Sequence, residues 1–366
     1  MSQEPWDIEE EPGRDGGDLY PGEKLWANRQ RALEEAGYML RRRYHPGWKS
    51  SWIGTNRLFT RVEDGQVQLK RVIMDATRIS DDKPVMLKLL LPKEGPYELE
   101  INRLFSSEPL LSNPRNHCAP LLDTIDLPNE PQMMVHAQLR PFNDPPMQTY
   151  GEFVAFFGQL CEGIQFMHEN HVAHRDCTRA NIMLEPSGMY PQSFHPVAIN
   201  RSRDFRKKAN GYSRTRRPPL YLLIDFGLSR RYDPANGPPL DKPLRGGDKS
   251  APEHQDRDTP CNPFPTDIYY IGNLVREEFS QKYLGFEFMN PLVADMTLDD
   301  PQGRPTAQEV VSRFEEIKRG LGVWKLRSRI ARKNEIWPVA VLRSVSHLYR
   351  TAGYVLTRTA AIPEPR

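Results

Sequence analysis

The clearest hydrophobic pattern in the chain lies between residues 150 and 170. Large apolar side chains recur there at steps of three and four, which is the period of one face of an α-helix. These side chains are Phe153, Phe157, Leu160, Ile164 and Met167. The pattern predicts a helix whose aromatic stripe is buried in a hydrophobic core rather than arranged around a cofactor.

Short apolar runs precede this helix and predict strands. The runs at 59–62, 67–74 and 84–91 are separated by turn-forming residues at 63–65 and 80–83, which predicts a small antiparallel sheet. Residues 133–139 predict a further strand. Between them, a helix is expected to begin near Gly95 and to carry Glu98, with Ile101 and Phe105 at helical spacing from it.

Residues 1–57 show neither pattern. They are rich in proline, glycine and charge, with an acidic start and the basic run Arg41-Arg42-Arg43. This composition predicts an N-terminal extension that is partly disordered, with one helical piece at about 24–43.

Composition narrows the class of protein. The 366 residues are 38% hydrophobic, which suffices for a core, and the net charge of +2 gives no overall field that would favour nucleic acid. The four cysteines form no C-x-x-C pair, which argues against a zinc site and a disulfide framework. The N-terminus is acidic, and no uninterrupted apolar run is long enough to span a bilayer. We therefore expect an intracellular protein, cytoplasmic or nuclear.

Candidate chemistry follows the predicted helix directly. The sequence H-R-D at 174–176 is followed by four residues, Asn181 and the apolar run 182–184. This spacing suits phosphoryl transfer, in which an aspartate takes the proton of the acceptor hydroxyl and an asparagine coordinates a metal on the nucleotide phosphates. An apolar strand ending in D-F-G at 225–227 and the sequence A-P-E at 251–253 come next. Three such signals in this order make a chance match improbable.

In this order the signals resemble those of the protein kinase family. The resemblance covers about residues 58–320 and implies an α+β, two-lobed protein-kinase-like fold with the active site between the lobes. The small β-rich lobe would span 58–138 and the larger α-helical lobe 139–320, with a hinge near 136–142. The activity implied is transfer of the γ-phosphoryl group of ATP, with Mg²⁺, to a protein hydroxyl, Ser/Thr more than Tyr.

The resemblance also assigns roles to individual residues. Asp176 would be the catalytic base, and Asn181 and Asp225 the metal ligands. Lys88, in the strand V-M-L-K, would hold the α- and β-phosphates, with Glu98 as the partner that orients it.

Three further positions carry alternatives or structural roles. Glu100 is the alternative to Glu98, disfavoured because it would place Arg103 where the family usually buries an aliphatic residue. Asp267, in D-x-x-x-x-G, would tie down the backbone of the H-R-D loop. Arg304 would pair with the glutamate of A-P-E.

Several departures from the family pattern predict low activity. The glycine-rich loop that covers the phosphates is missing, since the interval before Lys88 contains Gly65 alone. Thr178 and Gly246 stand where serine/threonine kinases have a lysine and a Ser or Thr. Arg179 is the nearby cation that would take over the phosphate contact, unless it is a plain surface arginine. Two rival functions remain open: a pseudokinase that acts as a nucleotide-binding or protein-interaction module, and a small-molecule kinase of similar fold.

Two basic segments have open interpretations. About thirty residues are inserted after Asn181, and 190–219 carry eight basic residues and one acid. They predict either a solvated, disordered loop or a docking site for an acidic partner; nucleic acid is disfavoured because the segment lacks an aromatic ladder. The tail, 321–366, interleaves nine basic residues with large apolar ones. It predicts either a helix packed on the large lobe or an amphipathic segment on an anionic membrane surface.

The segment between D-F-G and A-P-E offers few phosphorylation sites. Arg175 could pair with a phosphate, and the candidates are Ser229, Tyr232 and Ser250. We expect activity to depend only loosely on phosphorylation.

Overall fold

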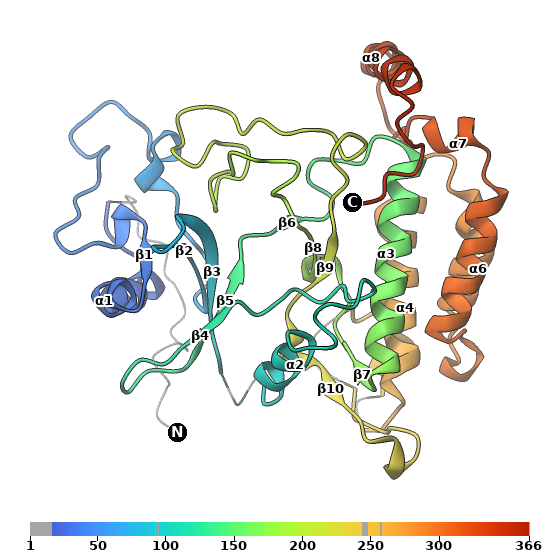
Figure 1. Ribbon diagram of the computed structural model, residues 1–366, viewed down its shortest axis with the longest axis horizontal. Coiled ribbons are helices and arrows are strands. Elements are labelled where there is room, and N and C mark those ends of the chain that lie inside the picture. Colours follow the sequence, from blue (N-terminus) through green and yellow to red (C-terminus); the bar gives the residue numbers. More distant parts are fainter. Residues whose placement is uncertain (1–16, 92, 94, 244–247, 257, 366) are drawn as a thin grey trace. The chain divides into compact units, whose positions relative to one another are not determined.

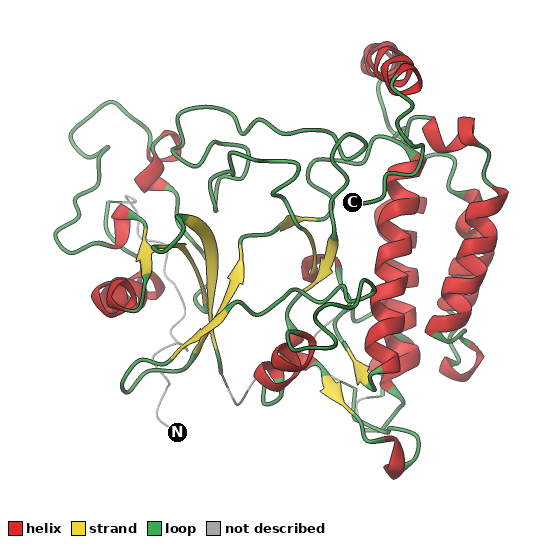
Figure 2. Cartoon of the chain, viewed as in Figure 1, coloured by secondary structure: helices red, strands yellow, loops and turns green. Residues whose placement is uncertain are grey.

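The computed structural model describes residues 17–91, 93, 95–243, 248–256 and 258–365 (Figures 1 and 2). The described residues form two compact units, here called the sheet unit and the helical unit. The sheet unit takes its residues from Met1–Pro92, Pro120–Leu139 and Tyr190–Gly211, and the helical unit from Lys93–Ala119, Arg140–Met189 and Tyr212–Arg366.

A five-stranded antiparallel sheet is the centre of the sheet unit. Its strands are β1 (Tyr38–Leu40), β2 (Ile73–Arg78), β3 (Lys83–Leu89), β4 (Asp123–Ile125) and β5 (Met133–Ala137), in the order β1-β2-β3-β5-β4. Helix α1 (Pro21–Glu35) packs on one face, where Trp26 and Leu33 share a core with Val85, Leu87 and Leu89 of β3. Strands predicted at 84–91 and 133–139 are confirmed as β3 and β5.

The region before β2 differs from the prediction. Residues 17–57, expected to form an extension, supply α1 and β1 to the sheet unit, and Tyr38 and Tyr44 are buried in its core. Residues 59–62, expected to form the first strand, contain a short 3₁₀-helix, and the turn expected at 63–65 is a second one. The composition suggested disorder because it is highly charged, yet these charges include Glu23 and Arg43, which are a buried ion pair inside the unit. Residues 1–16 lie outside the described residues.

The helical unit contains the predicted amphipathic helix. Its helices are α2 (Glu98–Phe105), α3 (Tyr150–Glu169), α4 (Pro263–Val275), α5 (Asn290–Met296), α6 (Ala307–Gly320), α7 (Val323–Arg327) and α8 (Trp337–Leu356). Short strands form two small sheets, β6 (Arg140–Pro141), β8 (Ile182–Leu184) and β9 (Tyr221–Leu223) in one, β7 (Val172–Ala173) and β10 (Arg230–Arg231) in the other. The stripe of α3 is buried as predicted, and its Phe157 lies 4.9 Å, centroid to centroid, from Phe314 of α6.

The boundary between the units falls inside the predicted hinge, but α2 is grouped differently. The chain leaves the sheet unit after Leu139, within 136–142. Residues 93–119 were expected in the small lobe, and they group with the helical unit. The reason is aromatic packing: the ring of Phe105 in α2 lies 6.0 Å from Phe166 of α3 and 6.3 Å from Phe226.

Candidate active site

A buried carboxylate holds the backbone of the H-R-D loop, residues 174–181. Asp267 of α4 is fully buried, and its two oxygens accept hydrogen bonds from the backbone N–H groups of His174 and Arg175, each at 2.7 Å. Hydrogen bonds to an ionised acceptor are short and strong, so two of them fix the direction of the loop. The prediction that Asp267 ties down this loop is confirmed.

Asn181 orients the side chain of Asp176. Asn181 Nδ2 donates to Asp176 Oδ2 at 2.7 Å and to the Asp176 backbone carbonyl at 3.0 Å. The other carboxylate oxygen, Oδ1, is buried and has no hydrogen-bond partner among the described residues. Burial raises the pKa of Asp176 to about 6; hydrogen bonds from Asn181 and Thr178 oppose this shift, and the charge of Asp225 adds to it. A buried oxygen that lacks a donor is suited to accept a proton.

The D-F-G segment is bonded to the same loop. The backbone N–H of Ile224 donates to the carbonyl of Asn181 at 3.0 Å. Asp225 has left-handed backbone angles, φ 64° and ψ 74°, a conformation that costs energy for a non-glycine residue and occurs preferentially at functional sites. The buried ring of Phe226 lies 5.5 Å from His174. The segment is thus held on both sides of Asp225.

Glu98 is the acid of α2 that borders this segment. Glu98 is 4% exposed, whereas Glu100 is exposed. A Cβ atom on Gly227 would lie 3.6 Å from Glu98 Oε2 and 3.3 Å from Asp225 Oδ1, so both carboxylates adjoin this glycine. Burial therefore favours Glu98 over Glu100 as the functional glutamate.

Lys88 belongs to the sheet unit, near the end of β3. Side chains alternate along a strand, and Leu87 and Leu89 point into the core shared with α1. Lys88 therefore lies on the opposite face. Its pairing with Glu98, and its contact with phosphate, stay predictions.

The metal ligands predicted from the sequence do not form a preassembled metal site. Within the described part of the chain, no group of three or more His, Cys, Asp or Glu side chains could hold a metal ion. Mg²⁺ does not require such a cluster, because it is usually bound by one or two protein side chains together with substrate phosphates and water. Asn181 and Asp225 fit that pattern.

The positions that depart from the kinase pattern, Thr178 and Gly246, and the nearby Arg179 have different surroundings. Arg179 is 60% exposed and forms an ion pair with Glu278 at 3.6 Å. Its role at phosphate stays a prediction, and this pair supports the alternative of a surface arginine. Thr178 donates its backbone N–H to the carbonyl of Asp176 at 2.8 Å. Gly246 lies outside the described residues.

An aspartate missed by sequence reasoning neutralises the arginine of H-R-D. Asp241 Oδ2 accepts from Arg175 Nη1 at 3.0 Å, from Arg230 Nη1 at 2.8 Å and from the hydroxyl of Tyr232 at 3.0 Å. Burial opposes ionisation, yet these donors hold the pKa of Asp241 below its usual value. A carboxylate thus sits where Arg175 could otherwise pair with a phosphate. No sequence signal distinguished Asp241 from other acids in this segment.

The A-P-E glutamate and Arg304 form the predicted pair. Arg304 Nη1 and Nη2 donate to the two oxygens of Glu253 at 2.6 and 2.8 Å, and both side chains are buried. This bidentate geometry is the strong form of an arginine–carboxylate contact. The prediction is confirmed.

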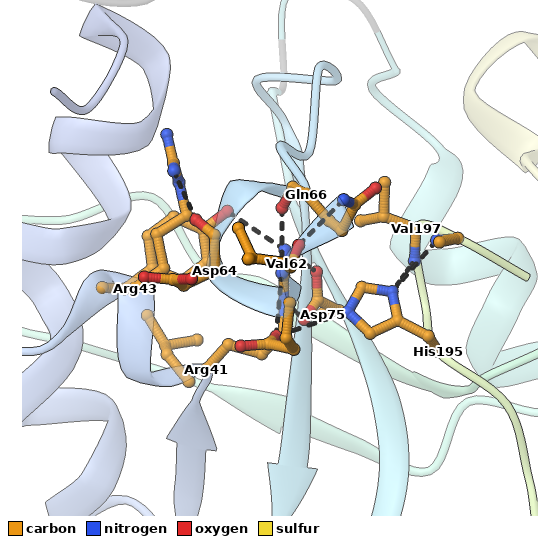
Figure 3. A network of polar contacts seen from close by, with 12 residues as sticks. Arg41, Arg43, Val62, Asp64, Gln66, Asp75, His195 and Val197 are labelled. Carbon is orange, nitrogen blue, oxygen red and sulfur yellow. Dashed lines mark hydrogen bonds and ion pairs between the residues drawn. The ribbon is translucent and has the colours of Figure 1, made fainter. Parts of the chain in front are cut away.

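The face of the sheet that bears Lys88 carries a second polar network. Asp75 of β2 pairs in register with Met86, two residues from Lys88, so Asp75 lies on the same face. It is 2% exposed and accepts from Arg41 Nε at 2.7 Å, and Arg41 also reaches Glu63 at 3.3 Å (Figure 3). Arg41 therefore neutralises both Asp75 on this face and Glu63 in the segment before β2.

The connection between β1 and β2 belongs to this network. Residues 41–72 join β1 to β2. The connection is fixed by Arg43, fully buried, which donates to both oxygens of Glu23 at 2.6 and 2.7 Å and to the carbonyl of Asp64 at 2.7 Å. The connection is therefore held by buried polar contacts and is not a flexible turn.

The basic insertion is ordered and packs on the sheet unit. His195, fully buried, approaches Glu63 at 3.3 Å through Nε2, and its Nδ1 accepts from backbone amides of its own segment (Figure 3). Arg203 donates to Asp82 at 2.8 to 3.0 Å and to the hydroxyl of Thr77 on β2 at 2.9 Å. The alternative of a solvated, disordered loop is therefore wrong for residues 190–211, because part of their charge is used in internal contacts. An acidic partner for the exposed basic residues stays a prediction.

The α+β architecture and the polar groups around Asp176 fit a kinase-like protein. The five-stranded sheet, the anchored H-R-D loop and the D-F-G segment together fit a kinase-like fold. No family model matches the chain.

One curated relative supports the same class. Over 100 residues the chain is 37% identical to serine/threonine-protein kinase CAK1 of Saccharomyces cerevisiae, a match that covers 25% of this chain and 20% of the relative. The chain therefore spans about a fifth of the length of the relative it matches. The match supports a kinase-like relationship.

Proposed function

We propose that this protein is an ATP- and Mg²⁺-dependent protein kinase of low activity. The observation that carries the proposal is the state of Asp176. Its Oδ2 is held by Asn181 at 2.7 Å, while its buried Oδ1 has no hydrogen-bond partner among the described residues. A purely structural aspartate would not be expected to leave a buried oxygen unsatisfied.

Asp176 acts as the base through Oδ1. Its pKa of about 6 leaves it mostly ionised at neutral pH, close enough to neutrality to accept and release a proton readily. Asn181 fixes the carboxylate so that Oδ1, not Oδ2, receives the hydroxyl proton. Asp267 keeps the backbone of the loop in place while this happens.

The remaining site residues would hold the nucleotide. Asn181 and Asp225 would bind Mg²⁺, and Lys88, oriented by Glu98, would bind phosphate oxygens. When bound, Mg-ATP supplies the phosphoryl group and neutralises its negative charge. The unsatisfied Oδ1 of Asp176 and the strained backbone of Asp225 both fit such a ligand, because each is the kind of feature that proteins retain at binding sites.

A protein substrate is favoured over a small molecule. Small-molecule kinases of similar fold usually lack the A-P-E glutamate and the helix that bears Asp267. Here Glu253 is clamped by Arg304, and Asp267 is bonded to the H-R-D loop. Serine or threonine as the acceptor, rather than tyrosine, follows from the resemblance alone.

Low activity follows from the positions that depart from the family. Thr178 supplies no cation at the γ-phosphate, and loss of one electrostatic stabiliser typically costs on the order of a hundred- to a thousandfold in rate. Arg179 would compensate in part.

A pseudokinase is the second candidate, and one observation favours it. On the face of the sheet that bears Lys88, Asp75 of β2 is paired with Arg41, and Thr77 of β2 is bonded to Arg203 of the insertion. In kinases that face is the nucleotide side of the sheet. If the cover is permanent, the protein would work as a binding module.

A single-turnover assay distinguishes the kinase from the pseudokinase. It measures phosphate transfer from labelled Mg-ATP to a generic protein substrate or to the protein itself. Removal of a general base typically costs about a hundred- to ten-thousandfold, so we expect a measurable wild-type rate that Asp176→Asn lowers by that amount. Asp299→Asn, an exposed aspartate of the same unit, is the matched control and should leave the rate unchanged. Equal rates for wild type and Asp176→Asn, with ATP still bound, would replace the kinase proposal by the pseudokinase one.

A further inference from the structure

Helix α8 presents its apolar side to solvent. Helices on the surface of a globular protein normally turn their apolar stripe inward. In α8 the less exposed positions are mostly small or polar and recur at helical spacing: Ala340, Ser344, His347, Thr351 and Tyr354. In Figure 1, α8 stands at one end of the helical unit, apart from α3 and α6.

The outward side is a continuous apolar face. Its members recur at steps of three and four along the helix and are all more than half exposed: Trp337, Val341, Leu342, Val345, Leu348 and Tyr349. Trp337 is 78% exposed, Leu342 72% and Tyr349 84%. Single exposed apolar residues are ordinary, but a contiguous face of this kind marks an interaction surface.

The helix is held in this orientation by its inner side. The hydroxyl of Tyr354 lies 2.8 Å from that of Ser213, which precedes β9. Beyond α8, Ala361 lies so close to α3 that a Cβ on Gly151 would overlap its carbonyl oxygen. The apolar face is thus a fixed feature of the helical unit.

Arginines gather on the side of α8 away from this face, because Arg343 and Arg350 fall outside its helical spacing. A cavity of about 280 Å³ is lined by Arg329, Arg332, Arg343 and Arg350 together with apolar and neutral residues, and no carboxylate is among its lining residues. Glu335 pairs with Arg329 and Arg343. Among the described residues, Arg332 and Arg350 form no ion pair, so two positive charges remain for an external anion.

We propose that α8 lies in the surface of an anionic phospholipid membrane, with its apolar face among the acyl chains and the arginine cavity on lipid phosphate. The surface is complementary to such a bilayer in both respects, apolar area and positive charge. Residues 336–363 contain no acid, and Trp337 and Tyr349 are side chains suited to the membrane–water boundary. No described helix is long and apolar enough to cross a membrane, so α8 would lie in the plane of the interface.

The test uses the full chain, because the tail also packs on the helical unit: the backbone of Tyr150 donates to Ser328 at 3.3 Å. The measurement is co-sedimentation with phosphatidylcholine vesicles with and without phosphatidylserine. We expect binding to the anionic vesicles that weakens as salt is added. Leu342→Glu with Leu348→Glu should lower the affinity at least tenfold, while Leu69→Glu, an equally exposed leucine of the sheet unit, should not change it.

Arginine variants test the headgroup part separately. Each basic residue near an anionic surface contributes about fivefold in affinity, so Arg332→Ala with Arg350→Ala should weaken anionic binding by roughly 25-fold. Arg57→Ala, which is exposed elsewhere, is the control. Absence of sedimentation, equal binding to neutral vesicles, or a dimer in solution that Leu342→Glu with Leu348→Glu dissociates would each overturn the proposal; the dimer would assign the face to a second copy of the chain.

Discussion

The H-R-D loop of the helical unit and the Lys88 face of the sheet unit use their acids in opposite ways. In the loop, Asp176 keeps one buried oxygen without a partner, and the neighbouring residues orient it without satisfying it. On the sheet, Asp75 and Glu63 are both taken up by Arg41. Polar groups left available suit a ligand, whereas polar groups that satisfy one another suit a rigid scaffold.

The difference teaches where this chain has departed from the kinase pattern. Asp176, which would take the proton of the acceptor hydroxyl, is retained, and Asp267 holds the backbone of its loop. In the sheet unit, residues 41–72 join β1 to β2, and the insertion is bonded to Asp82 and Thr77. We propose that the loss of a cation at Thr178 and the polar cover on the Lys88 face of the sheet both lower the rate of transfer.

The largest expected effect is on stability. It tests whether buried ion pairs stabilise the helical unit and the sheet unit to the same extent. Arg304→Met would leave Glu253 buried without its partner, and Arg43→Met would do the same to Glu23. Breaking a buried pair in this way costs about 3–5 kcal/mol. We expect both substitutions to lower the free energy of unfolding in urea by that amount.

The exposed pair Arg31–Glu35 supplies the control. Arg31→Met should change stability little, because exposed pairs contribute little. If Arg43→Met were as mild as this control, the network of the sheet unit would not be a rigid scaffold, and the contrast between the two regions would fail.

Much of the helical unit could be predicted from the sequence. The stripe of α3, the anchor at Asp267 and the Glu253–Arg304 pair all depend on fixed spacings that one fold explains. In the sheet unit, β3 and β5 were found by their apolar runs. The start of the sheet was missed, because the segment that carries α1 and β1 also buries charged residues in pairs, and pairing between distant residues such as Glu23 and Arg43 leaves no local pattern.

The same limit applies to the sites. Asp176, Asn181 and Asp225 were identified because their motifs are local in sequence. Asp241 lies in the segment between D-F-G and A-P-E, far in sequence from Arg175. Composition gives no sign of the contact between the two residues. The outward orientation of α8 was also beyond the sequence, because an amphipathic pattern shows that two faces exist and not which one is buried.

The next prediction concerns the pH dependence of kcat/KM, which tests whether Asp176 is the base. Asp176 must be ionised to accept a proton, and its raised pKa of about 6 means that the protonated, inactive form dominates below that value. We expect kcat/KM to be level above about pH 7 and to fall roughly tenfold per pH unit well below 6. A level profile down to pH 5, with the fold intact by circular dichroism, would show that Asp176 is not the base.

A smaller effect is expected at Arg179. If it assists at phosphate despite its pair with Glu278, Arg179→Ala should lower the single-turnover rate about tenfold, a modest share of what one electrostatic group can contribute. Arg216→Ala, an exposed arginine of the same unit, is the control. Equal rates for the two variants would identify Arg179 as a surface arginine.

The most direct test of the account releases the insertion and measures transfer. His195→Ala with Arg203→Ala removes its contacts with Glu63, Asp82 and Thr77, whereas Arg206→Ala, an exposed arginine of the same segment, leaves them in place. We predict that the double variant transfers phosphate from Mg-ATP severalfold faster than wild type in a single turnover, and that adding Asp176→Asn abolishes the gain. A folded double variant whose rate stays at or below that of the wild type, or a gain that survives Asp176→Asn, would contradict the proposal that the polar cover on the Lys88 face of the sheet lowers the rate of transfer.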